Sequence, residues 1–183
     1  MLNAFKRRIV MKRGLAVVAI VLFALTAASF AQKPSPPAKA QCSFTDGKSV
    51  KVDYSSPRMK GRKIYGGLVP YGQVWRTGAN EATTFVTDTN LTVGGKDVPA
   101  GSYTIFTVPN ADKWVLIVNK KTGEWGIPYK YESDELARVD MTVGKTSGPI
   151  EDFTIGFDQK GDSCTMNLDW ENTRASVDIA EKK

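Results

Sequence analysis

Histidine is absent from the 183-residue sequence. Because histidine is the commonest general base and the commonest transition-metal ligand in proteins, its absence excludes Ser-His-Asp catalysis, Cys-His catalysis and histidine-based zinc sites. Cysteine is scarce too, since Cys42 and Cys164 are the only two and stand far apart, which argues against a structural zinc site. The patterns of a phosphate-binding loop and of an Asp-x-Asp-x-Asp-Gly calcium loop are also missing. We therefore expect no cofactor and no metal.

The sequence lacks an apolar run long enough to span a membrane. Its longest run, residues 15–25, has 11 residues, whereas a membrane-spanning helix needs about 20. Basic residues precede this run and small residues follow it, which is the order of a secretory signal peptide. We predict cleavage after Ala31 and a periplasmic or extracellular location, with no stable membrane anchor after cleavage. An uncleaved anchor, and a start at Met11 instead of Met1, remain open alternatives.

The predicted mature chain also lacks a strong excess of either charge. The whole sequence has a formal net charge of +6, from 25 Lys and Arg against 19 Asp and Glu. Residues 1–31 contain five of these basic residues and no acidic residue, so the mature chain carries a net charge of only +1. Nucleic-acid-binding domains are typically basic. We therefore expect no nucleic-acid partner.

The mature chain is long enough for one domain with its own core. Residues 32–41 are rich in Pro, Ala and Lys and show no apolar periodicity, which is typical of a flexible, solvated linker. We expect a signal peptide in 1–31, a linker in 32–41 and a single β-sandwich domain in 42–183. An exported location permits a disulfide between Cys42 and Cys164, but two unpaired thiols fit the sequence equally well. The oligomeric state is not indicated.

Short strands, not helices, account for the apolar pattern after residue 42. Segments rich in β-branched and aromatic residues alternate with turn sequences such as Gly94-Gly95 and Lys160-Gly161-Asp162. The clearest pair is a hairpin, with strands 102–108 and 114–119 joined by a loop of about five residues. The other predicted strands are 49–54, 63–68, 83–87, 137–143, 153–157, 164–170 and 175–179, and residues 132–137 form one short helical turn. The pattern predicts an all-β fold, an antiparallel sandwich or a jelly-roll-like small barrel of about nine to ten strands, preceded by a cleavable signal helix.

Polar and aromatic residues are densest in residues 56–83, where several glycines separate them. Near its end this segment contains Trp75, Arg76, Asn80 and Glu81, which supply an aromatic ring, a guanidinium, a carboxamide and a carboxylate. We predict a site in which Arg76 binds a carboxylate or sugar hydroxyls, Asn80 orients the ligand and Glu81 accepts a proton. The alternative is structural: Arg76 and Glu81 pair with each other or with nearby backbone and hold a long loop in place.

A second polar and aromatic set follows in residues 124–138. We predict that Trp125, Asp134 and Arg138 join the first set around one concavity, with Trp125 and Trp75 at a surface or pocket. Trp114 and Trp170 lie within strand segments and are assigned to the core. Glu81 and Asp134 are the candidate pair for acid–base catalysis, although a solvated surface position is the commoner fate of such carboxylates.

The segment WRTGANEAT, residues 75–83, resembles an uncharacterised bacterial family known as domain-of-unknown-function family 2911. The 102–108 and 114–119 hairpin, Trp125-Gly126, Tyr131 and Trp170 add to the resemblance, which covers roughly residues 56–179. It implies an exported bacterial domain and transfers no activity, because the family has no assigned catalytic or binding residues. Since exposed-type polar residues help to identify the family, a site and a structural role for this segment weigh equally.

The leading hypothesis is a non-catalytic, exported β-sandwich that binds a small polar ligand, a glycan or an envelope component through the 75–83 loop. One alternative is a hydrolase that uses Glu81 or Asp134 as its base, which requires two carboxyl groups facing a cleft. The other is a purely structural envelope domain in which the polar segment only fixes a loop.

Overall fold

The computed structural model describes residues 35–183; the predicted signal peptide and residues 32–34 lie outside the described residues. All pairings between the nine strands of this part are antiparallel, and its one helical turn is the 3₁₀ segment Glu132–Asp134. The strands are β1 (Pro37–Ser43), β2 (Ser49–Ser55), β3 (Thr83–Thr87), β4 (Leu91–Val93), β5 (Lys96–Val98), β6 (Gly101–Val108), β7 (Trp114–Asn119), β8 (Glu135–Lys160) and β9 (Ser163–Glu181). The predicted all-β fold is confirmed. None of the described residues belongs to a helix that is long and apolar enough to cross a membrane.

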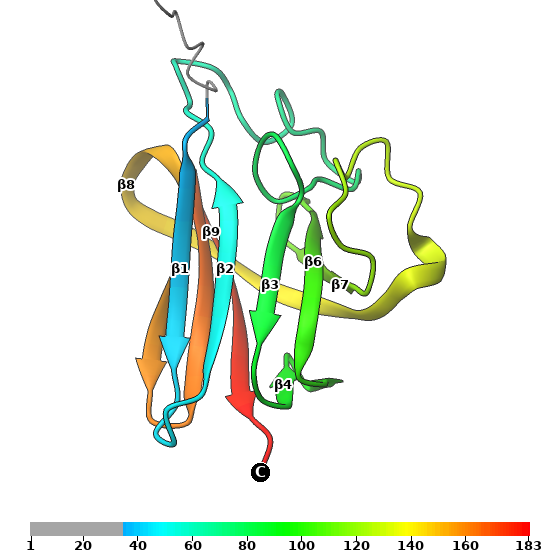
Figure 1. Ribbon diagram of the computed structural model, residues 1–183. Coiled ribbons are helices and arrows are strands. Elements are labelled where there is room, and N and C mark those ends of the chain that lie inside the picture. Colours follow the sequence, from blue (N-terminus) through cyan, green and yellow to red (C-terminus); the bar gives the residue numbers. More distant parts are fainter. Residues whose placement is uncertain (1–34) are drawn as a thin grey trace, which may run out of the picture. The chain divides into compact units, whose positions relative to one another are not determined.

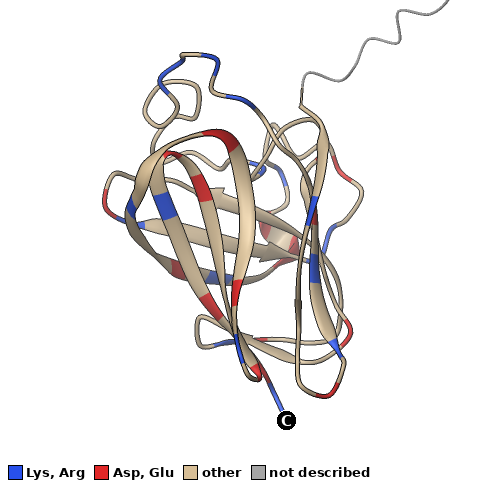
Figure 2. Cartoon of the chain, turned by 90° about the vertical axis from the view of Figure 1, so that its left-hand side faces the viewer, with Lys and Arg blue, Asp and Glu red and all other residues tan. Residues whose placement is uncertain are grey.

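The nine strands form one sheet in the order β1-β2-β3-β6-β7-β8-β9-β4-β5, and the sheet does not close into a barrel. Strand β8 connects its two halves: residues 135–141 pair with β7, and the strand pairs with β9 from Thr142 onward. The sheet folds over at β8, so that β1, β2, β3 and β6 lie in front of β8 and β9 (Figures 1 and 2). The fold is therefore a sandwich-like open sheet.

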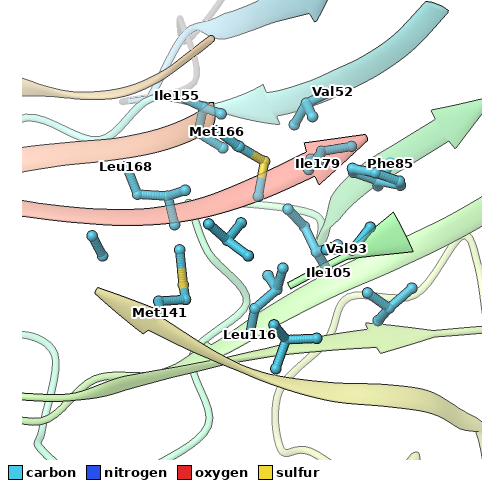
Figure 3. Packing of buried hydrophobic residues seen from close by; sticks show 14 of the residues in the cluster. Val52, Phe85, Val93, Ile105, Leu116, Met141, Ile155, Met166, Leu168 and Ile179 are labelled. Carbon is cyan, nitrogen blue, oxygen red and sulfur yellow. The ribbon is translucent and has the colours of Figure 1, made fainter. Parts of the chain in front are cut away.

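The hydrophobic core lies between the two layers. Along β2, Val50, Val52 and Tyr54 are buried and Lys51 and Asp53 are exposed, because successive side chains of a strand point to opposite faces. Figure 3 shows the core side chains of both halves meeting: Val52 and Phe85 come from β2 and β3, and Met166 and Ile179 from β9. Each such side chain contributes roughly 1.5–3 kcal/mol when it is removed from water. This packing fixes the layers that support the loops.

The predicted hairpin is confirmed: β6 and β7 pair up to Val108 and Val115, and residues 109–113 connect them. Every residue of β7 except Val115 is buried, as expected for a strand covered on both faces. The short helical turn predicted in 132–137 is the 3₁₀ segment Glu132–Asp134.

A disulfide joins Cys42 of β1 to Cys164 of β9. Both residues are buried in the core, so the bridge links the two layers of the sandwich. Of the two alternatives that the sequence left open, the structure contains the bridge.

The predicted linker is corrected, because residues 37–41 belong to β1. This strand pairs with β2 over seven residues, from Pro37 opposite Ser55 to Ser43 opposite Ser49. Pro37, Lys39 and Gln41 are exposed, while the alanines between them are half-buried. The Pro, Ala and Lys content that suggested a linker therefore belongs to an edge strand with one solvent-exposed face. Proline is tolerated at the first residue of such a strand.

Five strand predictions are also corrected. Residues 63–68 form a loop, in which the amide of Val69 donates to the carbonyl of Ile64 and Gly66 has a φ of +76°. The segments predicted as separate strands on either side of Gly144 are parts of the 26-residue β8, and those in 164–179 are parts of the 19-residue β9. The hairpin β4–β5 was not predicted; a β-carbon at Gly94, in its turn, would clash with Val139, which explains the glycine there.

Candidate functional site

Two loops lie at the same end of the sandwich (Figure 1): residues 56–82, between β2 and β3, and residues 120–134, between β7 and β8. The first is attached to β6, because Trp75 and Thr107 exchange backbone hydrogen bonds of 2.7 and 2.9 Å. The second is attached to the first, because the Ala82 amide donates to the Glu124 carbonyl at 3.1 Å. The two loops therefore form one connected structure.

Most polar side chains of the 75–83 segment form hydrogen bonds that fix the conformation of the segment. Thr77 and Asn80 have φ angles of +55° and +57°, which non-glycine residues rarely adopt. Asn80 donates through its amide to the Ser35 carbonyl at 3.0 Å and to the Ser55 hydroxyl at 3.1 Å, and the Thr83 hydroxyl donates to the Thr77 carbonyl at 2.7 Å. The structural role weighed for this segment therefore applies to Asn80, a predicted ligand-binding residue.

Arg76 differs from its neighbours, because its half-buried side chain reaches the other loop. Its guanidinium carbon lies 4.8 Å from the centroid of the Trp125 ring, and one terminal nitrogen donates to the Trp125 carbonyl at 3.3 Å. Burial lowers the pKa of Arg76, and the negative charge of exposed Glu81 opposes that shift. A β-carbon at Gly126 would lie 2.8 Å from Ala82 Cβ and 3.1 Å from Arg76 Cβ, so only glycine allows this close approach.

A pocket of about 860 Å³ opens between the two loops. Its walls are largely apolar, with aliphatic side chains from both loops, among them Leu68, Val74 and Ile127. Three aromatic residues also line it: Trp75, Tyr129 and the deeply buried Trp170. The rings of Trp75 and Trp170 are stacked, with centroids 6.0 Å apart and an interplanar angle of 18°. The aromatic core thus extends into the pocket.

Charged residues of the pocket lining are mainly cationic: Arg58, Lys60, Arg62 and Arg76, against the single carboxylate of Glu132. Two of the cations are engaged with other protein groups, Arg58 with a carboxylate of β8 and Arg62 with carbonyls of its own loop. Arg58 pairs with Asp152 at 2.9 Å, and Arg62 donates to the carbonyls of Met59 and Arg58 at 3.0 and 2.6 Å. Lys60 is exposed, and its ammonium group has no ion pair within the part of the chain that the structure describes. Lys60 and Arg76 are therefore the cations best placed to meet a ligand.

Of the predicted ligand-binding residues, Trp75 and Arg76 line the pocket, whereas Asn80, Glu81, Trp125, Asp134 and Arg138 do not. Arg138 forms a forked ion pair with Glu135, with nitrogen–oxygen distances of 2.6 and 2.7 Å. Glu135 also accepts a hydrogen bond of 2.7 Å from the Tyr129 hydroxyl. Arg138 thus supports a pocket wall from behind.

The candidate catalytic pair, Glu81 and Asp134, does not share the pocket. Asp134 accepts a hydrogen bond from the Lys120 amide at 2.9 Å through its main-chain carbonyl, so its backbone fixes the loop after β7. Glu81 is exposed at the end of the first loop. Neither of these two carboxylates lines the pocket between the loops.

Sequence reasoning missed several lining residues, among them Leu68 and Ile127, whereas Tyr129 belongs to the second polar and aromatic set, residues 124–138, that was expected to face the first. Leu68 lay in a segment predicted as a strand, and its neighbouring glycines were the available sign of a loop. Ile127 precedes Pro128 in a loop, and an aliphatic side chain at such a position was the available sign of a contact surface. Trp170 was assigned to the core, correctly, but its buried ring also contributes to the pocket surface.

A family model described as "Protein of unknown function (DUF2911)" matches residues 35–179. Comparisons with curated proteins and with solved structures gave no match. The matched range contains both pocket loops and the strands from β1 to Ile179 of β9, so the pocket lies within the family's shared region. The resemblance noted in the sequence is confirmed, and the chain belongs to the DUF2911 family of proteins of unknown function.

Proposed function

We propose that this chain is an exported, non-catalytic binding domain that takes up a small ligand with an apolar body and an acidic group. The observation that carries the proposal is the pocket of about 860 Å³, which combines apolar walls with the half-buried guanidinium of Arg76. Small-molecule sites are typically concave, about 300–1,000 Å³ in volume and mostly apolar, with a few polar groups that orient the ligand. The hypothesis of a small polar ligand is thereby sharpened to an amphipathic acid.

The position of Arg76 supports an acidic group on the ligand. Burial of a guanidinium removes part of its hydration, and this is the cause of the lowered pKa. A carboxylate or sulfonate offsets that loss, because a charge-assisted hydrogen bond is roughly twice as strong as a neutral one. The Trp125 ring holds the guanidinium from one side, so the ligand meets a side chain that is already positioned.

The carboxylates favour binding over hydrolysis. A hydrolase of the proposed alternative class needs two carboxyl groups facing one cleft. Among the residues that line the pocket, only Glu132 carries a carboxylate. The pocket therefore contains the guanidinium that binding of an acidic ligand needs, but not the second carboxylate that this class of hydrolase needs.

Export is supported by the leader pattern of residues 1–31 and by the disulfide, since disulfides persist in oxidising compartments. The test is to express the full chain in a bacterial host, fractionate the cells and determine the N-terminal residue by mass spectrometry. We expect a periplasmic or extracellular protein that begins at Gln32. A cytoplasmic protein with an intact leader contradicts this part of the proposal.

Binding is tested with two matched fluorescent probes. 8-Anilinonaphthalene-1-sulfonate and N-phenyl-1-naphthylamine share their ring system, and only the first carries an acidic group. We expect the purified protein to bind the sulfonate more tightly, and Arg76→Ala to weaken its binding by about tenfold, the effect of one charge-assisted hydrogen bond. Binding of the neutral probe should change by less than about twofold.

Arg174→Ala is the control, because it removes an exposed guanidinium on β9 that pairs with Asp169 and lies outside the pocket lining. Both probes should bind this variant as they bind the wild type. Equal weakening of both probes by Arg76→Ala, or sulfonate binding that is unaffected by it, contradicts the proposed role of Arg76.

A glycan is the second candidate ligand, because Trp75 and Tyr129 present aromatic rings to the pocket. Sugar rings stack on such side chains through their apolar faces. Calorimetric titration with neutral oligosaccharides separates the two proposals. Saturable binding of a neutral oligosaccharide that Trp75→Ala abolishes and Arg76→Ala leaves intact favours the glycan.

A further inference from the structure

Large hydrophobic side chains are exposed at only four positions in the described chain: Leu68 at 47%, Tyr71 at 45%, Trp125 at 55% and Ile127 at 42%. All four belong to the two pocket loops, and none lies on a strand. Leu68 and Ile127 line the pocket from opposite loops, and Trp125 stacks on Arg76, another lining residue. Isolated exposed apolar residues are normal, but a group confined to one end of a molecule marks an interaction surface.

Charge is segregated in the same way. Residues 56–83 and 120–134 together contain eight basic and four acidic residues. The remaining described residues contain eleven basic and fifteen acidic ones, so a domain with no net charge has a basic pocket end and an acidic remainder. Figure 2 shows Lys and Arg gathered in the loop at the top of the view, above long strands that carry many of the Asp and Glu.

The basic side chains lie close to the exposed hydrophobic ones. Lys60 and Arg62 line the pocket together with Leu68 and Ile127. Lys63 lies next to them in the chain and is exposed as well. Tryptophan and tyrosine favour the boundary between lipid headgroups and acyl chains, and lysine and arginine are attracted to anionic headgroups. This combination on adjoining loops matches the surface of an anionic bilayer.

We infer that the two loops form a membrane-docking surface, which binds reversibly to bilayers that contain anionic lipid. The aromatic and aliphatic side chains enter the headgroup layer, and Lys60 and Lys63 lie against the anionic headgroups. Docking does not depend on a ligand in the pocket. Where the proposed pocket ligand is also bound, the pocket mouth lies at the membrane surface, so an amphipathic acid passes between bilayer and pocket without crossing bulk water.

The inference is tested by sedimentation of the purified protein with vesicles of phosphatidylcholine alone and with vesicles that also contain about 30% phosphatidylglycerol. We expect about tenfold tighter binding to the anionic vesicles, and weaker binding as salt is raised from about 0.05 to 0.5 M. Wild type and variants are prepared with the same N-terminus, so any contribution of the leader is common to all of them.

Two variants separate the two components of the surface. Tyr71→Ser with Trp125→Ser removes aromatic side chains that lie outside the pocket lining, and Lys60→Glu with Lys63→Glu reverses two charges of the basic surface. Each double variant should weaken binding to the anionic vesicles by about tenfold or more. Lys96→Glu with Lys160→Glu makes the same change of charge outside the two loops and should weaken binding by less than about twofold.

Unfolding temperatures close to that of the wild type show that the variants are folded. Absence of vesicle binding overturns the inference, as does equal binding to neutral and anionic vesicles, or equal weakening by the control charges. Saturable binding to a second copy of the chain or to an anionic polysaccharide, without binding to vesicles, also overturns it and assigns the surface to that partner. Vesicle binding is measured without the fluorescent probes and probe binding without vesicles, so failure of one proposal leaves the other standing.

Discussion

The sandwich and the pocket end of this protein are held together by different kinds of interaction. In the sandwich, buried apolar side chains from both layers pack together and a disulfide crosses the core. At the pocket end, polar side chains bond to backbone groups and residues with positive φ are common, as for Thr77 and Asn80. The first region is stabilised mainly by removal of apolar surface from water. The second also buries Ile64, Tyr65 and Val69 in the core, but its 75–83 segment is held by hydrogen bonds in a less favourable backbone conformation.

This difference separates two neighbouring polar residues of the 75–83 segment. The side-chain amide of Asn80 donates hydrogen bonds to Ser35 and Ser55, whereas the guanidinium of Arg76 lines the pocket. A residue can therefore help to identify the family and still have a structural role instead of binding a ligand. Substitutions should divide accordingly into those that lower stability and those that lower binding.

The largest expected effect is in the core. Trp114→Ala removes a fully buried ring that packs against Tyr65 at a centroid distance of 4.9 Å, and it should lower the free energy of unfolding by about 3–5 kcal/mol. Trp125→Ala removes an exposed ring and its contact with Arg76, and should cost at most about 1 kcal/mol. Urea unfolding at pH 7 measures both. Similar losses for the two variants contradict the division into a packed sandwich and a solvated pocket end.

The disulfide should have the next largest effect. Replacing Cys42 and Cys164 with serine releases a crosslink across a sequence separation of 122 residues, and should lower the free energy of unfolding by about 2–5 kcal/mol. A reducing agent provides the control, because it should lower the unfolding temperature of the wild type and leave that of the double variant unchanged. Sensitivity of both proteins to the reductant indicates another cause.

Much of the sandwich was predictable, because burial imposes a period of two on strand sequences. Strands β3 and β7 were predicted with their observed bounds, since alternation or a continuous apolar run marks them. Strand β1 was missed because its outer face is in water and its buried face carries alanines, so the apolar signal is weak. The length of β8 was also missed, because Gly144 resembles a turn residue but continues the pairing, opposite Arg174.

The pocket was only partly predictable. Arg76 and Trp75 stood out because charge and aromatic surface adjoin glycines, which is a local signal. The opposite wall arises from Ile127 and Tyr129. The two segments were predicted to meet around one concavity, but through Trp125, Asp134 and Arg138, which do not line the pocket, and the sequence alone does not fix how the two loops make contact. That contact depends on the pairing of β6 with β7 and on the space left by Gly126, which are tertiary facts.

Asn80 should show a smaller effect on stability than the disulfide. Asn80→Ala removes two hydrogen bonds and places alanine at a positive φ, and should lower the free energy of unfolding by about 1–2 kcal/mol. Asn80→Gly is the matched control, because glycine accepts the backbone conformation and loses only the hydrogen bonds. We expect the sulfonate probe to bind both variants within about twofold of the wild type. A tenfold loss of probe binding at unchanged stability would instead assign Asn80 to ligand binding.

The smallest expected effect is that of the ion pair behind the pocket wall. Arg138 and, to a lesser extent, the Tyr129 hydroxyl lower the pKa of Glu135 below its ordinary value of 4.5. Since the folded-state pKa is below the unfolded one, the pair stabilises the fold above about pH 4.5 and this contribution is lost as the pH falls through the folded-state pKa. Glu135→Gln should therefore cost about 0.5–1 kcal/mol at pH 7 and much less near pH 3.

Thermal unfolding of wild type and Glu135→Gln at pH 7 and near pH 3 measures this difference. Asp140→Asn is the control, because Asp140 pairs with Lys113 at 3.0 Å in an exposed position and its loss should be nearly neutral at both pH values. A gap between wild type and Glu135→Gln that is equally wide at both pH values assigns the effect to lost packing of the Tyr129 wall. A gap that closes at low pH shows that the charge pair of Glu135 and Arg138 stabilises the fold directly behind the Tyr129 wall of the pocket.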